Sequence, residues 1–393
     1  MNHSSLFCAG VGPRLVVHAV DAADFSLRPI QEIPLAGAVQ YACQAPATGL
    51  FYAAVSNGGP RVAGDTHELR AFRIDGQGML AAHGKPAPLR SRPVHVCIDP
   101  RGRHLLVAYH KPSGLSVHRV EENGTVGEEV PQPSDLDAGV YAHQILVSSD
   151  SRLAILCARG NDAKDGRPED PGALKVFDYD DGRLTFQKSV APGGGYGFGP
   201  RNIVFHPRKP WIYVALERQN KLFVFETVDG TVRDEPLYIK ETLKDPGRIF
   251  HKQVVGAIGL HPSGKALYVV NRGGPHNPLE VHLGGENAVV RFDLDPATGE
   301  PLLAQHADTR GNRPRTFSID PSQTMMVVGN MQQRLLREGD VETAIPPGLA
   351  VFEVDEKGGL AFRRRYDVDV GQDSLFWSGF IAAGGTDARA AGL

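Results

Sequence analysis

Apolar stretches recur along the chain in pairs, and a tight polar turn joins the two members of each pair. The copies read VQYACQAPATGLFYAAV, VHVCIDPRGRHLLVAYH, HQILVSSDSRLAILCAR, RNIVFHPRKPWIYVALE, AIGLHPSGKALYVVNR and RTFSIDPSQTMMVVGN. Their turn residues are Pro46, Pro100, Ser149, Pro207, Pro262 and Pro321, spaced by 49 to 59 residues. Short apolar runs rich in β-branched and aromatic side chains are typical of strands, and no long helical pattern competes with them.

Each unit continues into a third apolar strand, such as LSVHRV, LKVFDY, LFVFET, AVVRFDL or LAVFEV, and then into a weaker fourth. Four strands in roughly 50 residues are the repeat of a β-propeller blade. The six units, numbered here as blades 1 to 6, leave an N-terminal pair (SSLFCAG, RLVVHAV) and a C-terminal strand (DSLFWSGFIA). Together these would form a seventh blade and close the ring, which removes the open sheet edge.

We therefore predict an all-β fold, a seven-bladed β-propeller of four-stranded antiparallel blades, with one domain over residues 1–393. A solenoid or two sandwich domains would not explain why the leftovers at both ends match.

Ionisable residues recur at one end of the predicted blades. Ten residues after each turn residue, where the second strand ends, lie Ser56, His110, Arg159, Glu217, Arg272 and Met331. Five or six residues before it, where the first strand starts, lie Gln40 and Tyr41, His95, His143, Arg201 and Asn202, Gly256 and Ala257, and Arg315. Because antiparallel strands bring these two ends together, we expect a ring of charged side chains around the central channel.

The segments that join second and third strands are long in four blades, at 58–67, 160–172, 274–287 and 331–348. All of them are expected on the same face as the ring, where long loops on a rigid scaffold usually carry function. The sequence thus predicts a basic pocket with one central carboxylate, walled by loops.

Composition narrows the classes of partner. The formal charge is −3, from 42 basic and 45 acidic residues without clusters, and nucleic-acid binding needs clustered Lys and Arg. No apolar run approaches the roughly 18 residues of a membrane span, and residues 1–20 do not resemble a signal peptide. Cys8, Cys43, Cys97 and Cys157 lie in apolar runs without a CxxC pair, as expected of buried thiols in a reducing compartment. We expect a cytoplasmic monomer that binds neither nucleic acid nor membrane.

Several of these residues also have a plainer interpretation. Arg201 and Arg315 would each also fit an ion pair between blades, and His143 would fit a histidine satisfied in the core. His276, Glu280 and His282 match no standard metal spacing, so we predict no metal. The glycine-rich run at 193–199 lacks the strand–loop–helix context of a phosphate loop and indicates a connection between blades.

The segment GPRNIVFHPRKPWIYVALERQNKLFVF strongly resembles the fourth blade of the seven-bladed propeller lactonases, the family that contains propeller-type 6-phosphogluconolactonase and carboxymuconate cyclase. HPSGKALYVVNRG and PRTFSIDPSQTMMVVGN resemble its fifth and sixth blades, and the likeness covers nearly the whole chain in register. It implies that His143, Arg201, Glu217 and Arg272 are the catalytic residues, with a further family arginine at Arg315. The remaining residues expected to bind substrate are His95, His110, Arg159, Asn202 and Asn271.

The resemblance implies hydrolysis of a sugar-acid lactone in carbohydrate catabolism, without a cofactor. Arginines would hold the anionic substrate and polarise the ester carbonyl, while Glu217 or His143 moved the proton. Two alternatives stay open at this point. One is a cycloisomerase that forms a lactone from a carboxymuconate-like diacid, and the other is a propeller that binds a ligand without catalysis.

Overall fold

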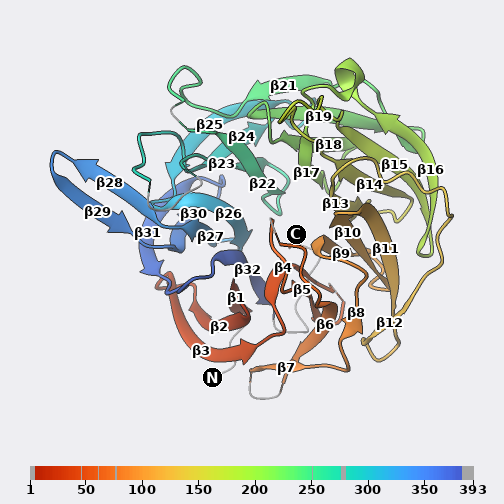
Figure 1. The fold of residues 1–393 in the computed structure, drawn as a ribbon, viewed down its shortest axis with the longest axis horizontal. Helices are drawn as coiled ribbons and strands as arrows, with labels where there is room; N and C mark the ends of the chain where they lie inside the picture. Colours follow the sequence, from red (N-terminus) through yellow and green to blue (C-terminus); the bar gives the residue numbers. More distant parts are fainter. Residues whose placement is uncertain are drawn as a thin grey trace.

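The computed structural model describes residues 5–45, 47–60, 62–75, 78–249, 251–275 and 280–382 of the chain. Within these ranges seven antiparallel sheets of four or five strands stand around a central axis (Figure 1). This confirms the all-β, seven-bladed propeller. The turn residue Pro46 lies outside the described residues.

The first three blades follow the repeat predicted from the sequence. Blade 1 consists of β4 (Ala38–Gln44), β5 (Phe51–Ser56), β6 (His67–Ile74) and β7 (Leu80–Ala82), with the short β8 (Ala87–Pro88) also paired to β6. Blade 2 consists of β9 (Pro93–Ile98), β10 (His104–His110), β11 (Ser113–Val120) and β12 (Val126–Glu129). Blade 3 consists of β13 (Ala142–Val147), β14 (Leu153–Ala158), β15 (Ala173–Asp180) and β16 (Arg183–Val190).

The next three blades keep the same order. A short 3-10 helix, η1 (Pro192–Gly195), leads into blade 4, which consists of β17 (Pro200–Phe205), β18 (Trp211–Leu216), β19 (Lys221–Val228), β20 (Thr231–Val232) and β21 (Tyr238–Glu241). Blade 5 consists of β22 (Val254–Leu260), β23 (Ala266–Arg272), β24 (Ala288–Leu294) and β25 (Pro301–Asp308). Blade 6 consists of β26 (Asn312–Ile319), β27 (Met325–Gln332), β30 (Gly348–Val354) and β31 (Leu360–Asp367).

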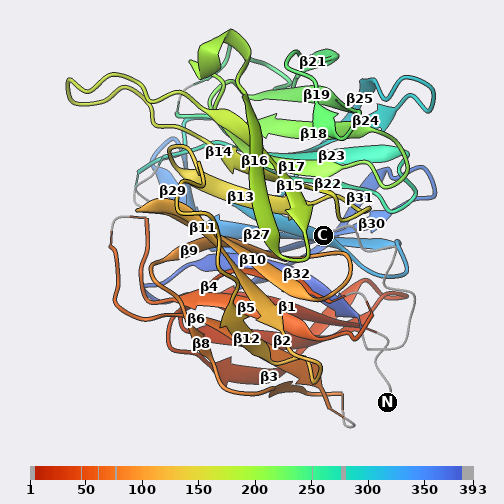
Figure 2. The ribbon, with the colours of Figure 1, turned by 90° about the vertical axis from the view of Figure 1, so that its right-hand side faces the viewer.

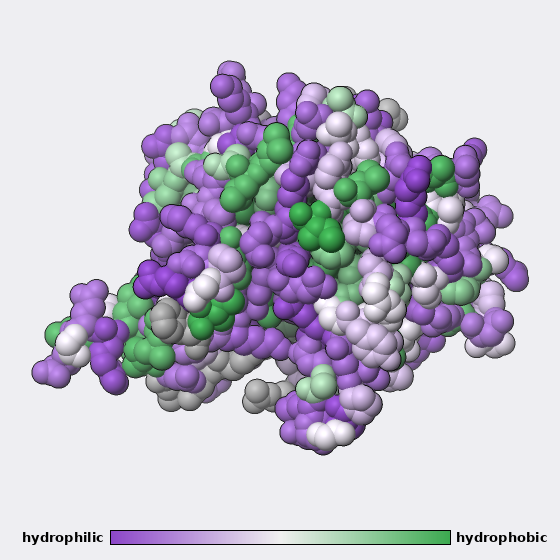
Figure 3. Space-filling model, turned by 90° about the horizontal axis from the view of Figure 1, so that it is seen from above, coloured by the Kyte–Doolittle hydropathy of each residue, from purple (hydrophilic) through white to green (hydrophobic). Residues whose placement is uncertain are grey.

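The last connection differs from the expected loop. Part of 331–348 forms a separate hairpin of β28 (Arg334–Glu338) and β29 (Val341–Ile345), which projects from the body at the left of Figures 1 and 3. On the face shown in Figure 3 hydrophilic residues predominate and the apolar ones are scattered.

Both ends of the described chain close the ring in blade 7. Its order is β3 (Ser26–Pro34), β2 (Arg14–Asp21), β1 (Ser5–Val11) and β32 (Leu375–Ala382), so the C-terminal strand is innermost and pairs antiparallel with the N-terminal one. The side view in Figure 2 shows β32 and β1 lying between the strands of blades 6 and 1. The predicted shared blade is thereby confirmed.

The second strand of each blade is buried on both of its faces by the neighbouring blades. This explains why β5, β14 and β18 read as unbroken apolar runs instead of alternating ones. The apolar core lies between successive blades, as in the cluster that joins β14 and β15 to β18 and β19.

Buried tyrosines connect neighbouring blades at one repeated position. The hydroxyls of Tyr52, Tyr213 and Tyr268 donate to backbone carbonyls in the next blade, at distances of 2.8, 3.1 and 2.7 Å. The acceptors are Gly124, Gly299 and Gly358, each in a turn between third and fourth strands and each with positive φ. A Cβ at Gly358 would lie 2.6 Å from the Tyr268 hydroxyl, so this position needs glycine.

Candidate active site

A β-bulge at the start of the innermost strand recurs in all seven described blades, on the face where second strands end; we call this end of the propeller the loop face. In blades 3, 4 and 6 the ladder skips one residue, between Ala142 and Gln144, Pro200 and Asn202, and Pro314 and Thr316. The residues left unpaired by the ladder are therefore His143, Arg201 and Arg315. A bulge re-aims the side chain it inserts, which explains how these residues leave the alternation of their strands.

The other blades use the same position differently. The bulge residues are Gln40 in blade 1, Val94 in blade 2, Gly256 and Ala257 in blade 5, and Phe376 in blade 7. A Cβ at Gly256 would lie 3.0 Å from Arg272 Nε, so the glycine leaves room for the side chain of Arg272.

Glu217, directly after β18, is the centre of an ion-pair cluster. Its Oε1 accepts from Arg272 Nη2 at 2.8 Å and lies 3.2 Å from Arg201 Nε. Its Oε2 accepts from Arg159 Nε. All four side chains are at most 14% exposed, so both carboxylate oxygens are committed to buried arginines from three blades.

Electrostatics around Glu217 strongly favour the charged carboxylate. Burial alone would raise the pKa of Glu217, but Arg159, Arg201 and Arg272 outweigh it and hold the pKa well below its usual range. For Arg272, burial and then the neighbouring Arg201 lower the pKa to about 9. Burial and then Arg201 also lower the pKa of Arg315. The cluster therefore has an excess of positive charge for which one carboxylate does not compensate.

Neutral histidines lie beside this cluster. The partly buried His143 has no hydrogen-bond partner at Nδ1 among the residues that the structure describes, and burial followed by Arg201 lowers its pKa well below the usual value. Within the described part of the chain the buried His95 also lacks a partner at Nδ1. Its ring lies 4.1 Å from that of Tyr41, and burial followed by Arg201 lowers its pKa to about 3. Both imidazoles are thus unprotonated at neutral pH and able to accept a proton.

Tyr141 bridges the histidines of blades 2 and 3. Its ring lies 3.9 Å from that of His110 and 6.1 Å from that of His143, and the guanidinium of Arg159 lies 5.0 Å above it. Its φ is 60°, a left-handed conformation that is uncommon for an aromatic residue. Burial, followed by Arg92, Lys111 and Arg159, lowers the pKa of His110 to about 4.

The opposite wall belongs to blades 1, 2, 6 and 7. Arg315 Nε donates to the carbonyl of Phe376 at 2.8 Å, and its guanidinium lies 3.6 Å from the centre of the Phe376 ring. Arg92 Nε donates to Gln40 Oε1 at 2.9 Å, and its guanidinium lies 5.9 Å from the same ring. Two cations thus lie close to one aromatic side chain.

The two predicted asparagines have different surroundings. Asn202 Oδ1 accepts from Arg201 Nη1, which fixes that arginine next to Glu217. Asn271 Nδ2 donates to the carbonyl of Thr242 at 2.7 Å and to Glu286 Oε2 at 3.1 Å, so the amide nitrogen of Asn271 is engaged outside the arginine cluster.

Comparison with known proteins agrees with this architecture. The family profile "Lactonase, 7-bladed beta-propeller" matches residues 9–337.

The chain belongs to the seven-bladed β-propeller lactonases.

Curated relatives of this chain are named as lactonases. The 6-phosphogluconolactonase of Bacillus subtilis is 27% identical over 291 residues, covering 69% of this chain and 76% of the relative. That of Cronobacter sakazakii is 26% identical over 303 residues, covering 77% and 78%. The solved periplasmic gluconolactonase of Pseudomonas aeruginosa, 21% identical, superposes with a TM-score of 0.69 over 96% of this chain and 99% of its own, which supports the fold.

The ring also contains residues that the spacing in the sequence did not predict. Arg92, Tyr141 and Arg313 each lie eight residues before a turn residue, whereas the predicted ring residues lie five or six residues before it. Arg313, 7% exposed, has a φ of 52° and lies near Glu217 and Arg201. The spacing of eight residues is common to all three, but the left-handed backbone of Tyr141 and Arg313 is not visible in the sequence.

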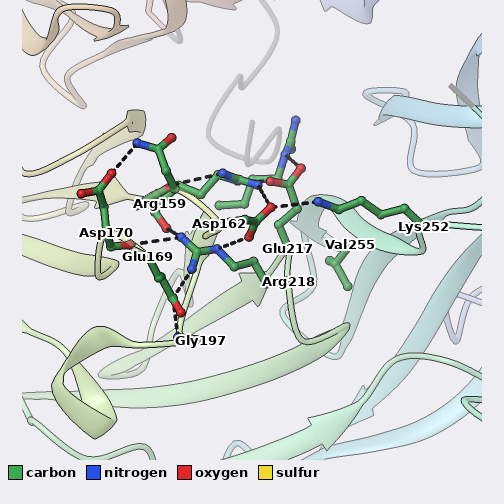
Figure 4. A network of polar contacts seen from close by, with 12 residues as sticks. Arg159, Asp162, Glu169, Asp170, Gly197, Glu217, Arg218, Lys252 and Val255 are labelled. Atoms are coloured by element: carbon green, nitrogen blue, oxygen red, sulfur yellow. Dashed lines mark hydrogen bonds and ion pairs between the residues drawn. The ribbon is translucent and has the colours of Figure 1, made fainter. Parts of the chain in front are cut away.

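A network of ion pairs and hydrogen bonds holds the long loop of blade 3 next to the cluster (Figure 4). Asp162 Oδ1 lies 3.0 Å from Arg218 Nε, and Asp162 Oδ2 lies 2.9 Å from Lys252 Nζ and 3.6 Å from Arg159 Nη2. Glu169 pairs with Arg218 and accepts from the Gly197 backbone N–H at 2.6 Å. The loop at 160–172 is thereby tied to blade 4 and to Lys252, and it contacts Arg159, which itself binds Glu217.

The histidine-rich loop of blade 5 contains the residues whose spacing was compared with that of metal sites. The structure describes only part of this loop. His276 lies outside the described residues. The rings of His251 and His282 lie 5.8 Å apart, and Glu280 lies 3.9 Å from His251 Nδ1. Among the residues that the structure describes, no group of three or more His, Cys, Asp or Glu side chains is arranged to hold a metal.

Two further findings concern the cysteines and the membrane. All four cysteines are free, and Cys8, Cys97 and Cys157 are buried as predicted, whereas Cys43 near the end of β4 is only partly buried. In the described ranges no helix has the length and apolar character to cross a membrane.

Proposed function

We propose that this chain hydrolyses the lactone of a sugar acid, adding water across the ring ester to give the open-chain carboxylate and a hydroxyl group. The observation that carries the proposal is the convergence of Arg159, Arg201 and Arg272 on one carboxylate with the neutral His143 beside them. The 6-phosphogluconolactonase relatives support the same class of reaction.

The arginines act on the negative charge that forms during the reaction. Attack of water on the lactone carbonyl places charge on the carbonyl oxygen, and fixed guanidinium donors in a buried site stabilise that oxyanion. The excess of positive charge also suits a substrate that carries a phosphate or carboxylate, because arginine binds both with paired hydrogen bonds.

His143 is the base in this proposal. It accepts the proton of the attacking water and returns it to the alkoxide that leaves when the ring opens. Burial and then Arg201 lower the pKa of His143, and an anion bound among the arginines would offset the second of these causes and raise that pKa.

Glu217 has a positioning role in this scheme. Its oxygens are occupied by three arginines and its pKa is held low, which makes it a poor acceptor for the proton of water. It holds the guanidinium groups in the orientation that receives the oxyanion.

A pH-indicator assay of acid release from 6-phosphogluconolactone, gluconolactone and uronolactones tests the proposal. Lactones hydrolyse spontaneously, so the essential control is Glu217→Gln, which keeps size and polarity but weakens the hold on the arginines. We expect acceleration by the wild type and loss of most of it in the variant. Rates equal to the spontaneous ones for both proteins across the panel would contradict lactone hydrolysis.

A further inference from the structure

A cavity of about 860 Å³ opens on the loop face beside the arginine cluster. It lies where blades 6, 7 and 1 meet. The β1–β2 turn, the start of β4, the segment after β5, the end of β27 and the segment before β32 all line it. These are the same structural positions that carry the charged ring in blades 2 to 5.

The lining of the cavity combines apolar side chains with several amides and is nearly uncharged. It includes the amides of Gln40, Asn57, Gln332 and Gln372, and among the described lining residues Asp373 alone is charged. An amide both donates and accepts hydrogen bonds, which matches the neutral hydroxyl groups of a sugar. Gln332 Oε1 is itself buried and makes no hydrogen bond within the described protein.

Two side chains that line the cavity also contact Arg92 and Arg315, the arginines opposite the ion-pair cluster. Gln40 lines the cavity and accepts from Arg92, and Phe376 lines the cavity while Arg315 lies 3.6 Å from its ring centre. Both are bulge residues of the innermost strands. A ligand whose anionic end binds the arginines would therefore enter the cavity with the part attached to that end.

The cavity is larger than a single sugar lactone needs. Pockets for ligands of drug size span roughly 300–1,000 Å³, and this one lies in the upper part of that range before the space among the arginines is added. A monosaccharide lactone bound at the arginines would leave it unfilled.

We propose that the cavity is a subsite for a neutral glycosyl group, and that the preferred substrate is the lactone of a disaccharide acid, an aldobionolactone. Its lactone ring lies at the arginine cluster and its second sugar among the amides of blades 6, 7 and 1. This inference rests on the proposed lactone hydrolysis for the reaction itself, but the subsite is testable by binding alone.

Gly59 offers a way to fill the cavity without disturbing the arginines. It lines the cavity, its φ lies outside the left-handed region, and a Cβ placed on it would meet no heavy atom within 4 Å. Gly59→Trp therefore places a large side chain at the cavity, and Gly59→Ala is the matched control for losing glycine at that position.

Calorimetric titration with stable product acids measures the subsite. Cellobionate and gluconate carry the same carboxylate head, and cellobionate adds one neutral glucose. We expect the wild type and Gly59→Ala to bind cellobionate about tenfold more tightly than gluconate, since two modest hydrogen bonds account for such a factor. In Gly59→Trp the preference disappears while gluconate affinity stays unchanged. Equal affinities in the wild type, or a preference that survives Gly59→Trp, would overturn the subsite.

Turnover of gluconolactone and cellobionolactone separates this inference from the proposed function. Hydrolysis of both at equal kcat/KM, with no cellobionate preference, rejects the subsite and keeps the lactonase. Spontaneous rates for both lactones reject the proposed function, and the product-acid titration then still decides whether the cavity binds a glycosyl group.

Discussion

Blades 3 to 5 and blades 7 and 1 present the same strand ends to the loop face but equip them with opposite chemistry. The second strands of blades 3 to 5 end next to Arg159, next to Glu217 and at Arg272, whereas those of blades 7 and 1 end at Val11 and Ser56. One side of the loop face is thus an ion-pair cluster and the other a neutral cavity. The same β-bulge at the start of the innermost strand therefore occurs both at the charged cluster and at the uncharged cavity.

The largest effect on activity is expected from replacing His143, the proposed base. His143→Gln removes the proposed base but leaves Glu217 and its arginines in place, so kcat should fall about a hundred- to ten-thousandfold. Initial rates of acid release, compared with unchanged thermal unfolding, measure this. His110→Gln, next to the same Tyr141 ring, is the control with kcat near the wild-type value, and equal losses in both variants would contradict the role of His143.

Glu217→Gln should lower stability as well as activity. It leaves three buried arginines without their carboxylate, and breaking a buried ion pair from one side costs about 3 kcal/mol. Denaturant unfolding measures the free energy. An Asp373→Asn variant in the neutral cavity, where no arginine pair is lost, should change stability little. A fully stable Glu217→Gln protein would show that the cluster is not held by this carboxylate.

Acid should destabilise the charged side of the ring. The folded pKa values of His95 and His110, about 3 and about 4, are lowered first by burial, so protonation near pH 5 is easier in the unfolded chain. The contribution is present above the usual histidine pKa of about 6.5 and is lost as pH falls from there towards 4. Glu217 has the same sign, with loss beginning below about pH 4.5.

Thermal unfolding between pH 7 and pH 4 measures this dependence. His95→Asn and His110→Asn together should flatten the curve between pH 6.5 and 5. An unchanged slope in the double variant would assign the acid sensitivity to other groups.

The smallest effect concerns the loop at 160–172. Asp162→Asn weakens contacts to Arg218 and Lys252, but the Asp162 side chain is 41% exposed, and such pairs contribute little each. We expect KM to rise about threefold with kcat unchanged. Steady-state kinetics measures it, with Asp165→Asn in the same loop as control. A large fall in kcat would mean that the loop acts on the chemical step.

Much of the fold is readable in the sequence because the propeller repeats one unit. Apolar second strands, turn residues at regular spacing and matching end segments specify seven blades and the shared blade 7. The sequence predicts the ends of the second strands correctly because the length of these strands is nearly constant. Arg159, Glu217 and Arg272 each lie ten residues after the turn residue of their blade.

The rest of the site depends on backbone geometry that spacing does not encode. The bulges leave His143, Arg201 and Arg315 unpaired in the strand ladder, and the sequence does not show where a bulge occurs. The positive φ angles of Tyr141 and Arg313 cannot be predicted from the sequence either. For Asn271, the sequence places a polar residue next to Arg272 but does not show that its amide nitrogen donates to Thr242 and Glu286.

The most direct test of the central claim is a crystal structure of the protein with cellobionate bound. The account predicts the carboxylate within hydrogen-bond distance of Arg201 or Arg272, His143 beside it, and the neutral sugar in the cavity between Gln40 and Gln332. A ligand bound elsewhere, with the arginine cluster unoccupied at saturating concentration, would contradict it.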